Sequence, residues 1–296
     1  MTVSITVLDG GLSTALEEVG ADIGGPLWTA RAILESPDLL EEAHRRFVNA
    51  GATVITTASY QCGAHEFARL GLSDRDARRA LASTVDVARR ATAGTDARVA
   101  ASVGPFGAVL ADGSEYTGRY DVSWEVVERY HREKLEVLVD AGADLLAVET
   151  IPLAAEARLV AGILEDLGAP PAWFSFGVDP NRLTYGGDDV GVAVTAVAGY
   201  AHLVAVGVNC THPNVIDEII DLVGANAPGV PLVAYPNLGR SWNADIRQWS
   251  GEISDPFAPD RVAHWAGRGV TMIGGCCGVG PADIARLVAT VTPPVT

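Results

Sequence analysis

Three stretches of the sequence share one pattern, and that pattern limits the possible fold more than any other feature. Each has a helical segment, a glycine and then a short apolar run: NAGATVITTASY at 49–60, DAGADLLAVETI at 140–151 and GRGVTMIGGCCG at 267–278. A glycine in that position fits the left-handed residue that ends a helix. The apolar run fits a strand buried on both faces. The pattern is therefore the helix-to-strand half of a repeated βα unit.

The same template predicts eight strands along the chain. They are expected at 4–8, 53–58, 98–103, 144–148, 173–178, 203–208, 231–235 and 270–274. Helical patterns separate them, such as PDLLEEAHRRFVNAG, which Pro37 opens and Gly51 closes. Eight strands alternating with helices indicate an α/β fold, a single-domain parallel (β/α)8 TIM barrel over residues 1–296. A doubly wound open sheet is the alternative.

Composition and charge exclude several classes of protein. The net charge of −16 argues against a nucleic-acid partner. The first residues, MTVSITVLDGG, lack the basic and apolar regions of a secretory signal. No apolar run reaches the roughly 18 residues of a membrane span. We therefore expect a cytoplasmic protein without a membrane or nucleic-acid partner, as a monomer or homodimer. Thiols stay reduced in the cytoplasm, so clustered cysteines there suggest metal binding or catalysis.

The chain has one lysine, Lys134, inside the helical pattern WEVVERYHREKLEVLVDAG. We expect this side chain to face solvent. Schiff-base chemistry and Walker-type phosphate binding use a lysine at a strand end or in a loop, so both are disfavoured.

Two connections, 104–122 and 236–257, are too long for simple turns. Long βα loops are often active-site walls or lids, and ordinary surface decoration is the alternative.

Reactive side chains directly follow most of the expected strands. They are Asp9, Tyr60 with Gln61, Glu149, Cys210, Tyr235, and Cys276 with Cys277. In a parallel barrel the carboxyl ends of all strands meet at one rim, where the active site forms. The amino-terminal ends carry no such set, so the pattern predicts a site at the carboxyl-terminal rim.

Cys210, Cys276 and Cys277 are the candidates for a metal site. In a barrel they would follow strands six and eight, two positions apart around one rim. Three converging thiolates suit Zn²⁺ and leave a fourth tetrahedral position open, as in catalytic zinc sites. Cys210 alone is equally consistent with a small buried residue, and the adjacent pair with a vicinal disulfide or tight packing. Cys62 is expected to pack in the core, and His65 and His212 to lie in loops or on the surface.

Nine motifs in this order carry a family resemblance. They are LDGG with TALE (8–11 and 14–17), PLWTA (26–30), ITTASYQ (55–61), SVGPFG (102–107), DGSEYTG (112–118), AGADLLAVETIP (141–152), GVNC (207–210), VAYPN (233–237) and GGCCG followed by PADI. Together they resemble the homocysteine S-methyltransferase family. The likeness is closest to enzymes that use S-methylmethionine or S-adenosylmethionine. Betaine–homocysteine methyltransferases share the cysteine pattern more distantly.

The resemblance implies roles for matching positions. Family members are zinc-dependent (β/α)8 barrels, and the three cysteines match their metal ligands. Glu149 matches the carboxylate that holds the homocysteine amino group, and Asp9 and Gly10 match the start of a substrate-binding turn. Glu149 and Asp9 are thus the expected catalytic residues. Trp28 and Tyr60 match aromatic positions near the two sulfurs. One departure is CCGVGP, in place of a CCRTTP-like continuation, and it puts the local donor contacts in doubt.

The reaction implied is methyl transfer from a sulfonium donor to the thiolate of homocysteine, with small-molecule substrates and Zn²⁺ as cofactor. A free thiol is mostly protonated at neutral pH, and zinc binding removes that proton. Aromatic faces can hold the sulfonium by cation–π attraction, with Trp28, Tyr60 and Phe106 as candidates. Tyr116 and Trp242, on the two long loops, are expected to close over it.

Other readings remain open from sequence alone. A betaine donor, or another thiol or selenol acceptor, would fit the same family. A zinc hydrolase with Glu149 as base would be a different enzyme class, although such sites favour histidine and carboxylate ligands. A structural zinc clip would need a fourth protein ligand, and the sequence offers no convincing one. Cobalamin or folate chemistry would need further domains.

Overall fold

The computed structural model describes residues 4–25, 28–239, 241–243, 248–250 and 254–292. Eight parallel strands alternate with helices along the chain, as expected. The strands are β1 (Thr6–Val7), β2 (Val54–Thr56), β3 (Arg98–Val103), β4 (Leu145–Ile151), β5 (Ala172–Phe176), β6 (Leu203–Asn209), β7 (Leu232–Tyr235) and β10 (Val270–Ile273). Each overlaps one of the eight predicted strands.

The strands form a ring rather than an open sheet. Their order is β1-β10-β7-β6-β5-β4-β3-β2, and every neighbouring pair is parallel. A parallel bridge between Leu8 and Val54 joins the two ends of this order, supported by a 2.8 Å hydrogen bond from the Thr53 N–H to the Val7 carbonyl. The fold is therefore a (β/α)8 TIM barrel, and the alternative of a doubly wound sheet is wrong.

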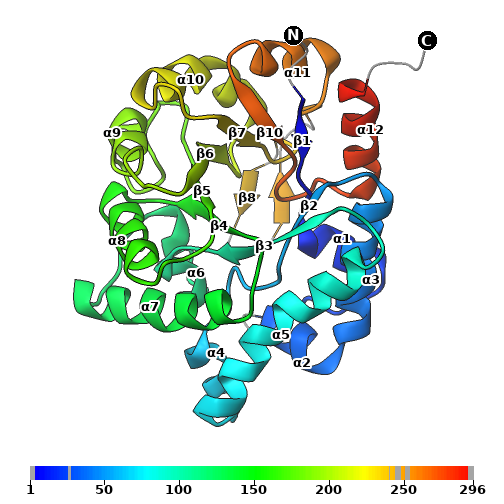
Figure 1. Cartoon of the computed structure of the whole chain (residues 1–296), viewed down its shortest axis with the longest axis vertical. Coiled ribbons are helices and arrows are strands. Elements are labelled where there is room, and N and C mark those ends of the chain that lie inside the picture. Colours follow the sequence, from blue (N-terminus) through cyan, green and yellow to red (C-terminus); the bar gives the residue numbers. More distant parts are fainter. Residues whose placement is uncertain (1–3, 26–27, 240, 244–247, 251–253, 293–296) are drawn as a thin grey trace.

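Helices surround the strands (Figure 1). Their bounds are α1 (Leu12–Glu18), α2 (Trp28–Glu35), α3 (Pro37–Asn49), α4 (Ala64–Arg69), α5 (Asp74–Thr92), α6 (Phe106–Leu110), α7 (Trp124–Asp140), α8 (Ala154–Asp166), α9 (Val190–Thr195), α10 (Pro213–Asn226), α11 (Pro259–Ala266) and α12 (Pro281–Val291). In the three repeated stretches Gly51, Gly142 and Gly269 have φ of 97°, 75° and 90°. Their left-handed conformations confirm that each glycine ends a helix and turns the chain into a strand.

The two long connections contain structure that their sequences did not indicate. Segment 104–122 holds α6 and a 3-10 turn, η1 (Ser114–Tyr116). Segment 236–257 holds β8 (Ser241–Asn243) and β9 (Gln248–Ser250), which pair antiparallel as a hairpin. Elements of three to five residues are too short to produce a readable periodicity.

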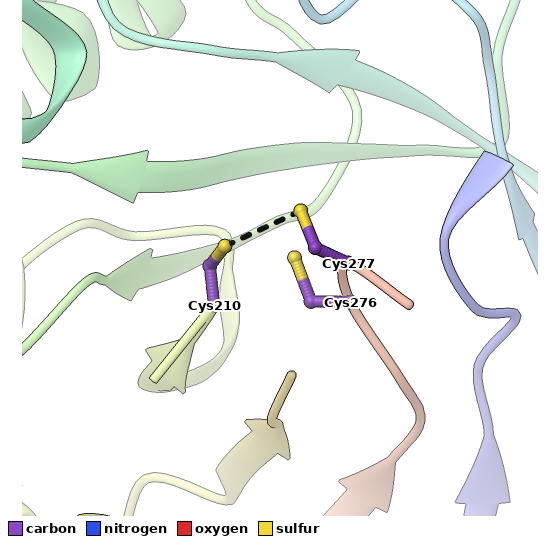
Figure 2. Close-up of side chains that lie close together, drawn as sticks. All are labelled: Cys210, Cys276 and Cys277. Atoms are coloured by element: carbon purple, nitrogen blue, oxygen red, sulfur yellow. Dashed lines mark hydrogen bonds between the residues drawn. The ribbon is translucent and has the colours of Figure 1, made fainter. Parts of the chain in front are cut away.

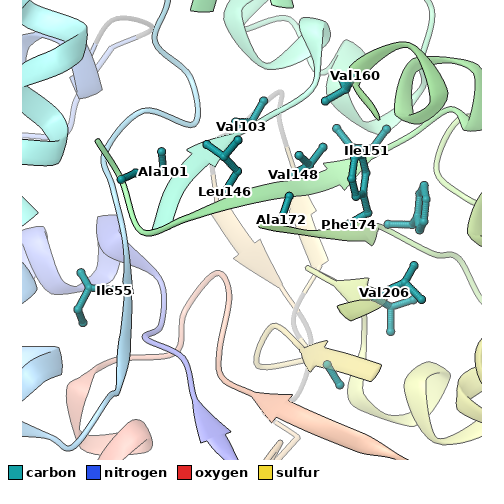
Figure 3. Packing of buried hydrophobic residues seen from close by; sticks show 14 of the residues in the cluster. Ile55, Ala101, Val103, Leu146, Val148, Ile151, Val160, Ala172, Phe174 and Val206 are labelled. Atoms are coloured by element: carbon teal, nitrogen blue, oxygen red, sulfur yellow. The ribbon is translucent and has the colours of Figure 1, made fainter. Parts of the chain in front are cut away.

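Two apolar layers stabilise the barrel. The inner layer fills the ring of strands and includes Leu8, Trp173 and Met272. The outer layer lies between strands and helices, where Val148 and Phe174 point toward the surrounding helices (Figure 3). Because both faces of each strand are covered, the strands read as continuous apolar runs. No helix in the described part of the chain is long and apolar enough to cross a membrane.

Candidate active site

A cavity of about 960 Å³ opens at the carboxyl-terminal ends of the strands. Its lining comes from the carboxyl-terminal ends of the strands, such as Glu149 in β4, from residues that follow them, such as Cys210 after β6, and from residues of segment 111–116 in the first long connection. Each side chain predicted for the site lies in this lining: Asp9, Gly10, Trp28, Tyr60, Glu149, Cys210, Cys276 and Cys277. The cavity thus joins predicted site residues that are up to 268 positions apart (277 − 9) in the chain.

The three cysteines converge on one point of the cavity (Figure 2). Their sulfurs all lie within 4.8 Å of one another, and Cys210 Sγ is 3.6 Å from Cys277 Sγ. Zinc–sulfur bonds of about 2.3 Å in a tetrahedron would separate the sulfurs by about 3.8 Å, so the spacing suits such an ion. Within the described residues, this is the one group of His, Cys, Asp or Glu side chains spaced to hold a metal. The cysteines are free thiols, so the alternative of a vicinal disulfide is not found.

Without a metal, the cluster favours a single thiolate at Cys277, because the pKa values of its neighbours Cys210 and Cys276 lie well above their usual range. Hydrogen bonds from Cys210 and then Cys276 hold the pKa of Cys277 well below its usual range. A soft, partly ionised trio of sulfurs is the donor set expected for Zn²⁺ or a similar ion. The chemistry of the residues therefore fits a bound metal.

Glycines make the turn after β10 possible. A Cβ at Gly274 would approach the Asp9 carbonyl to 2.7 Å, and one at Gly275 would approach Val279 to 2.2 Å. Gly278 has a φ of 83°. Only glycine fits these positions, so the backbone can fold tightly enough to present Cys276 and its neighbour to the same point.

Cys210 sits in a strained backbone position with its own supports. Its φ is 50°, which is uncommon outside glycine. The Tyr185 hydroxyl donates to its carbonyl at 2.6 Å, and its N–H donates to the Tyr235 carbonyl at 3.1 Å. Asn209, fully buried beside it, donates to the Thr150 hydroxyl at 2.7 Å and accepts from the Thr150 N–H at 2.8 Å. These contacts aim the cysteine sulfur into the cavity.

Glu149 is placed by an irregularity in β4. The pairing of β4 with β5 shifts register between Val148 and Ile151, and Thr150 has a φ of 58°. Such bulges re-aim side chains near active sites. The Glu149 carboxylate accepts a short hydrogen bond from the Ser102 hydroxyl. Burial raises its pKa to about 7, although that hydrogen bond opposes the shift.

Asp9 and Gly10 form the turn after β1. Asp9 is buried, and its carboxylate accepts from the Thr56 N–H at 2.8 Å and from the Thr56 hydroxyl at 3.0 Å. Burial raises the pKa of Asp9 well above its usual range. A Cβ at Gly10 would meet the Val279 carbonyl at 2.5 Å, so the turn packs against the chain that follows the cysteine pair.

The aromatic residues predicted near the sulfurs divide into two groups. Trp28, Tyr60 and Tyr116 line the cavity. Phe106 does not appear in the lining; its ring packs edge-on against Tyr120, with centroids 5.3 Å apart, so its expected role in holding a sulfonium receives no support. The side chain of Trp242 lies outside the described residues, as does much of segment 236–257, so its expected role as a lid stays a prediction.

The expectation that Lys134 faces solvent is wrong. Its side chain is 1% exposed, and its ammonium group donates to the Tyr60 carbonyl at 3.0 Å and to the Tyr130 hydroxyl at 3.2 Å. Burial lowers its pKa to about 8. The lysine therefore holds the backbone of Tyr60, a residue that lines the cavity.

The remaining cysteine and histidine predictions have mixed outcomes. Cys62 is buried and lies outside the metal cluster, as expected. His212 caps α10 by accepting the Asn214 N–H at 3.1 Å. The side chain of His65 lies outside the described residues.

Glu156, which sequence reasoning missed, secures the first long connection at both ends. Its carboxylate accepts from the Phe106 N–H at 2.6 Å and from the Tyr120 hydroxyl at 2.7 Å, and it lies 2.8 Å from His131 Nε2. Glu156 and His131 are fully buried. These three contacts, here called the Glu156 clasp, hold both ends of the segment that supplies Glu115 and Tyr116 to the cavity.

Sequence reasoning also missed Tyr185, Asn209 and Glu115 as parts of the site. Tyr185 lies between β5 and α9, and its ring packs edge-on against Tyr116 with centroids 5.5 Å apart. A Cβ at Gly177 would be 2.2 Å from the Tyr185 ring, so only a glycine at this position leaves room for the ring. Asn209 and Glu115 stand inside the motifs GVNC and DGSEYTG, so those motifs were the available signal.

Comparison with known proteins agrees with this arrangement. A family model described as homocysteine S-methyltransferase matches residues 6–291. A homocysteine S-methyltransferase of Escherichia coli (strain K12) is 39% identical over 96% of this chain and 94% of that protein. A selenocysteine Se-methyltransferase of Brassica oleracea var. italica is 35% identical over 95% of this chain and 87% of that protein.

A solved structure extends the likeness to three dimensions. The metallated form of the homocysteine methyltransferase MmuM from Escherichia coli superposes with a TM-score of 0.84 at 37% identity. The match covers 97% of this chain and 96% of that one. The family model and the full-length relatives agree with the motifs and with the barrel, and the chain belongs to the homocysteine S-methyltransferase family.

Proposed function

We propose that this enzyme transfers a methyl group from a sulfonium donor to the thiolate of homocysteine, with Zn²⁺ held by Cys210, Cys276 and Cys277. The observation that carries the proposal is that three clustered thiols line a cavity whose described lining contains no basic side chain. Six acidic residues line the described cavity and no Lys, Arg or His does; the six are Asp9, Glu17, Asp22, Asp112, Glu115 and Glu149.

This charge pattern supports a cationic donor. S-methylmethionine and S-adenosylmethionine each carry a sulfonium, an ammonium and one carboxylate, so their net charge is positive. Betaine carries one positive and one negative charge and is neutral overall. A cavity lined by carboxylates favours the positively charged ligand. The sulfonium donors are therefore proposed in preference to betaine.

A metal at the three thiols supplies the activation step, because a zinc ion lowers the pKa of a thiol and holds it as a thiolate. The protein's own residues then have to orient two substrates. We assign the homocysteine ammonium to Glu149, which Ser102 holds, and its carboxylate to the turn at Asp9 and Gly10. Asp9 is tied to Thr56, so it supports that turn.

Trp28, Tyr60 and Tyr116 are assigned to the sulfonium. Their faces attract a positive charge that disappears as the methyl group leaves. Burial in the barrel mouth excludes water, which would otherwise compete for hydrogen bonds and weaken the electrostatic contacts. The main contribution is positioning, because the two sulfurs and the methyl carbon must lie on one line.

The test is methionine formation from homocysteine with S-methylmethionine, S-adenosylmethionine or betaine supplied separately. We expect turnover with one or both sulfonium donors and little with betaine. Chelator treatment should abolish turnover, and added Zn²⁺ should restore it. Turnover with betaine alone, or undiminished activity in protein shown to be free of metal, would refute the proposal. Selenocysteine belongs in the acceptor panel, because a relative 35% identical is a selenocysteine Se-methyltransferase.

A further inference from the structure

Glu115 is a buried carboxylate whose bonding is incomplete. It lies in η1 and lines the cavity, yet its side chain is only 8% exposed. Among the described residues, its Oε2 atom has no hydrogen-bond partner and is shielded from solvent. A buried acceptor without a donor is unfavourable, and more so when it is charged. Such a group in a binding cavity points to a ligand that supplies the donor.

The backbone around Glu115 is held firmly, so the carboxylate keeps its place. Gly107 packs directly on it, because a Cβ there would lie 2.4 Å from the Glu115 nitrogen. The N–H of Gly118 donates to the Ser114 carbonyl at 2.8 Å, which closes the turn. Glu156 anchors both ends of the segment, as described above. The carboxylate is thus presented to the cavity by a fixed turn.

The charged groups that interact with Glu115 are negative. Burial raises the pKa of its carboxyl to about 7, and the charges of Asp112 and Cys277 act in the same direction. The described lining of the cavity offers no basic side chain to compensate. A ligand with a positive, hydrogen-bearing group would satisfy both the charge and the missing hydrogen bond.

We propose that Glu115 binds the α-ammonium group of the methyl donor and so selects amino-acid sulfonium compounds. The inference rests on the proposed function, which it deepens by dividing the donor between two sets of residues. An ammonium has three N–H donors for the unpaired oxygen, whereas a sulfonium has none. A carboxylate in contact with the reactive methyl would also compete as a nucleophile for it. The ammonium therefore belongs at Glu115, and the sulfonium at the aromatic faces of Trp28, Tyr60 and Tyr116.

The experiment compares two donors in the metal-loaded protein. S-methylmethionine carries the ammonium, and the (2-carboxyethyl)dimethylsulfonium ion lacks it. Glu115→Gln keeps the shape of the side chain but removes its charge. The control is Glu35→Gln, since Glu35 is exposed and lies outside the cavity lining. Binding of each donor is measured by calorimetry, alongside KM for both substrates, metal content and thermal unfolding.

We expect Glu115→Gln to weaken S-methylmethionine binding by about tenfold to a hundredfold. Its affinity for the donor without an ammonium, its KM for homocysteine and its metal content should stay unchanged, and Glu35→Gln should resemble the wild type throughout. Equal losses for both donors, a loss confined to homocysteine, or no loss would each overturn the proposal. Absence of turnover with every sulfonium donor would instead refute the proposed function, while the calorimetry would still test Glu115.

Discussion

Replacing Lys134 with methionine should remove a pH dependence from the stability of the protein. The lysine is charged in water but buried here, with its ammonium group between the Tyr60 carbonyl and the Tyr130 hydroxyl. Burial lowers its pKa from 10.5 to about 8, while the charges of Cys62, Glu66 and Glu149 act against the shift. Methionine has a similar length and carries no charge, so it fills the same space.

The sign and size of the effect follow from this shift. Between about pH 8 and 10.5 the unfolded chain holds the proton and the folded protein does not, so the free energy of unfolding rises with pH. The full difference of about 2.5 pKa units (10.5 − 8) corresponds to about 3 kcal/mol. Roughly 2 kcal/mol of it should be recovered between about pH 7 and about pH 9.5. The wild type should therefore gain that amount relative to Lys134→Met.

The assay is urea unfolding of both proteins at several pH values across that range. Contributions from titrating groups that do not interact with Lys134 are common to both proteins and cancel in the difference. Cys62 and Glu149, whose pKa values the lysine charge lowers, are the groups whose contributions differ between the two proteins. Because Lys134 is the only lysine, ¹⁵N-lysine labelling gives one side-chain NMR signal and a direct titration. A stability difference that stays constant with pH, or a lysine signal that titrates near its ordinary pKa, would refute the reasoning.

Three further changes test the site. Cys210→Ser should lower the bound metal from one equivalent to a small fraction, while Cys62→Ser should retain it; equal metal in both would contradict the assignment. Glu149→Gln should raise the KM for homocysteine about tenfold or more with metal still bound, and an unchanged KM would remove its role. Glu156→Gln should lower the melting temperature by several degrees and speed proteolysis within segment 104–122, because its amide cannot accept all three hydrogen bonds; intact protection there would speak against the clasp.

The fold was predictable because its signals are local and repeated. Gly51, Gly142 and Gly269 each end a helix before an apolar strand, and a motif repeated along the chain leaves few other arrangements. The β8–β9 hairpin was not predictable, because strands of three residues hold too few positions for an alternating pattern.

The site was predictable where side chains follow strands, and it was not where the partner is a distant backbone group. The helical pattern around Lys134 does not reveal that the Tyr60 carbonyl faces it across 74 positions. The same is true of Tyr185, whose hydroxyl meets the carbonyl of Cys210. These contacts between a side chain and a distant carbonyl depend on the path of the loops at the barrel rim. The periodicity of a short stretch of sequence does not predict that path.

The pairing of β1 with β10 makes the three-cysteine cluster depend on closure of the barrel. Thr6 pairs with Met272, and the Gly275 N–H donates to the Asp9 carbonyl at 2.9 Å, so the earliest and latest strands support one turn. A chain on the ribosome exposes seven strands before the eighth emerges. Until then Cys210 lacks its two partner sulfurs, and the nascent protein has no complete thiol set to hold a metal ion. Metal uptake should consequently coincide with ring closure, late in biogenesis.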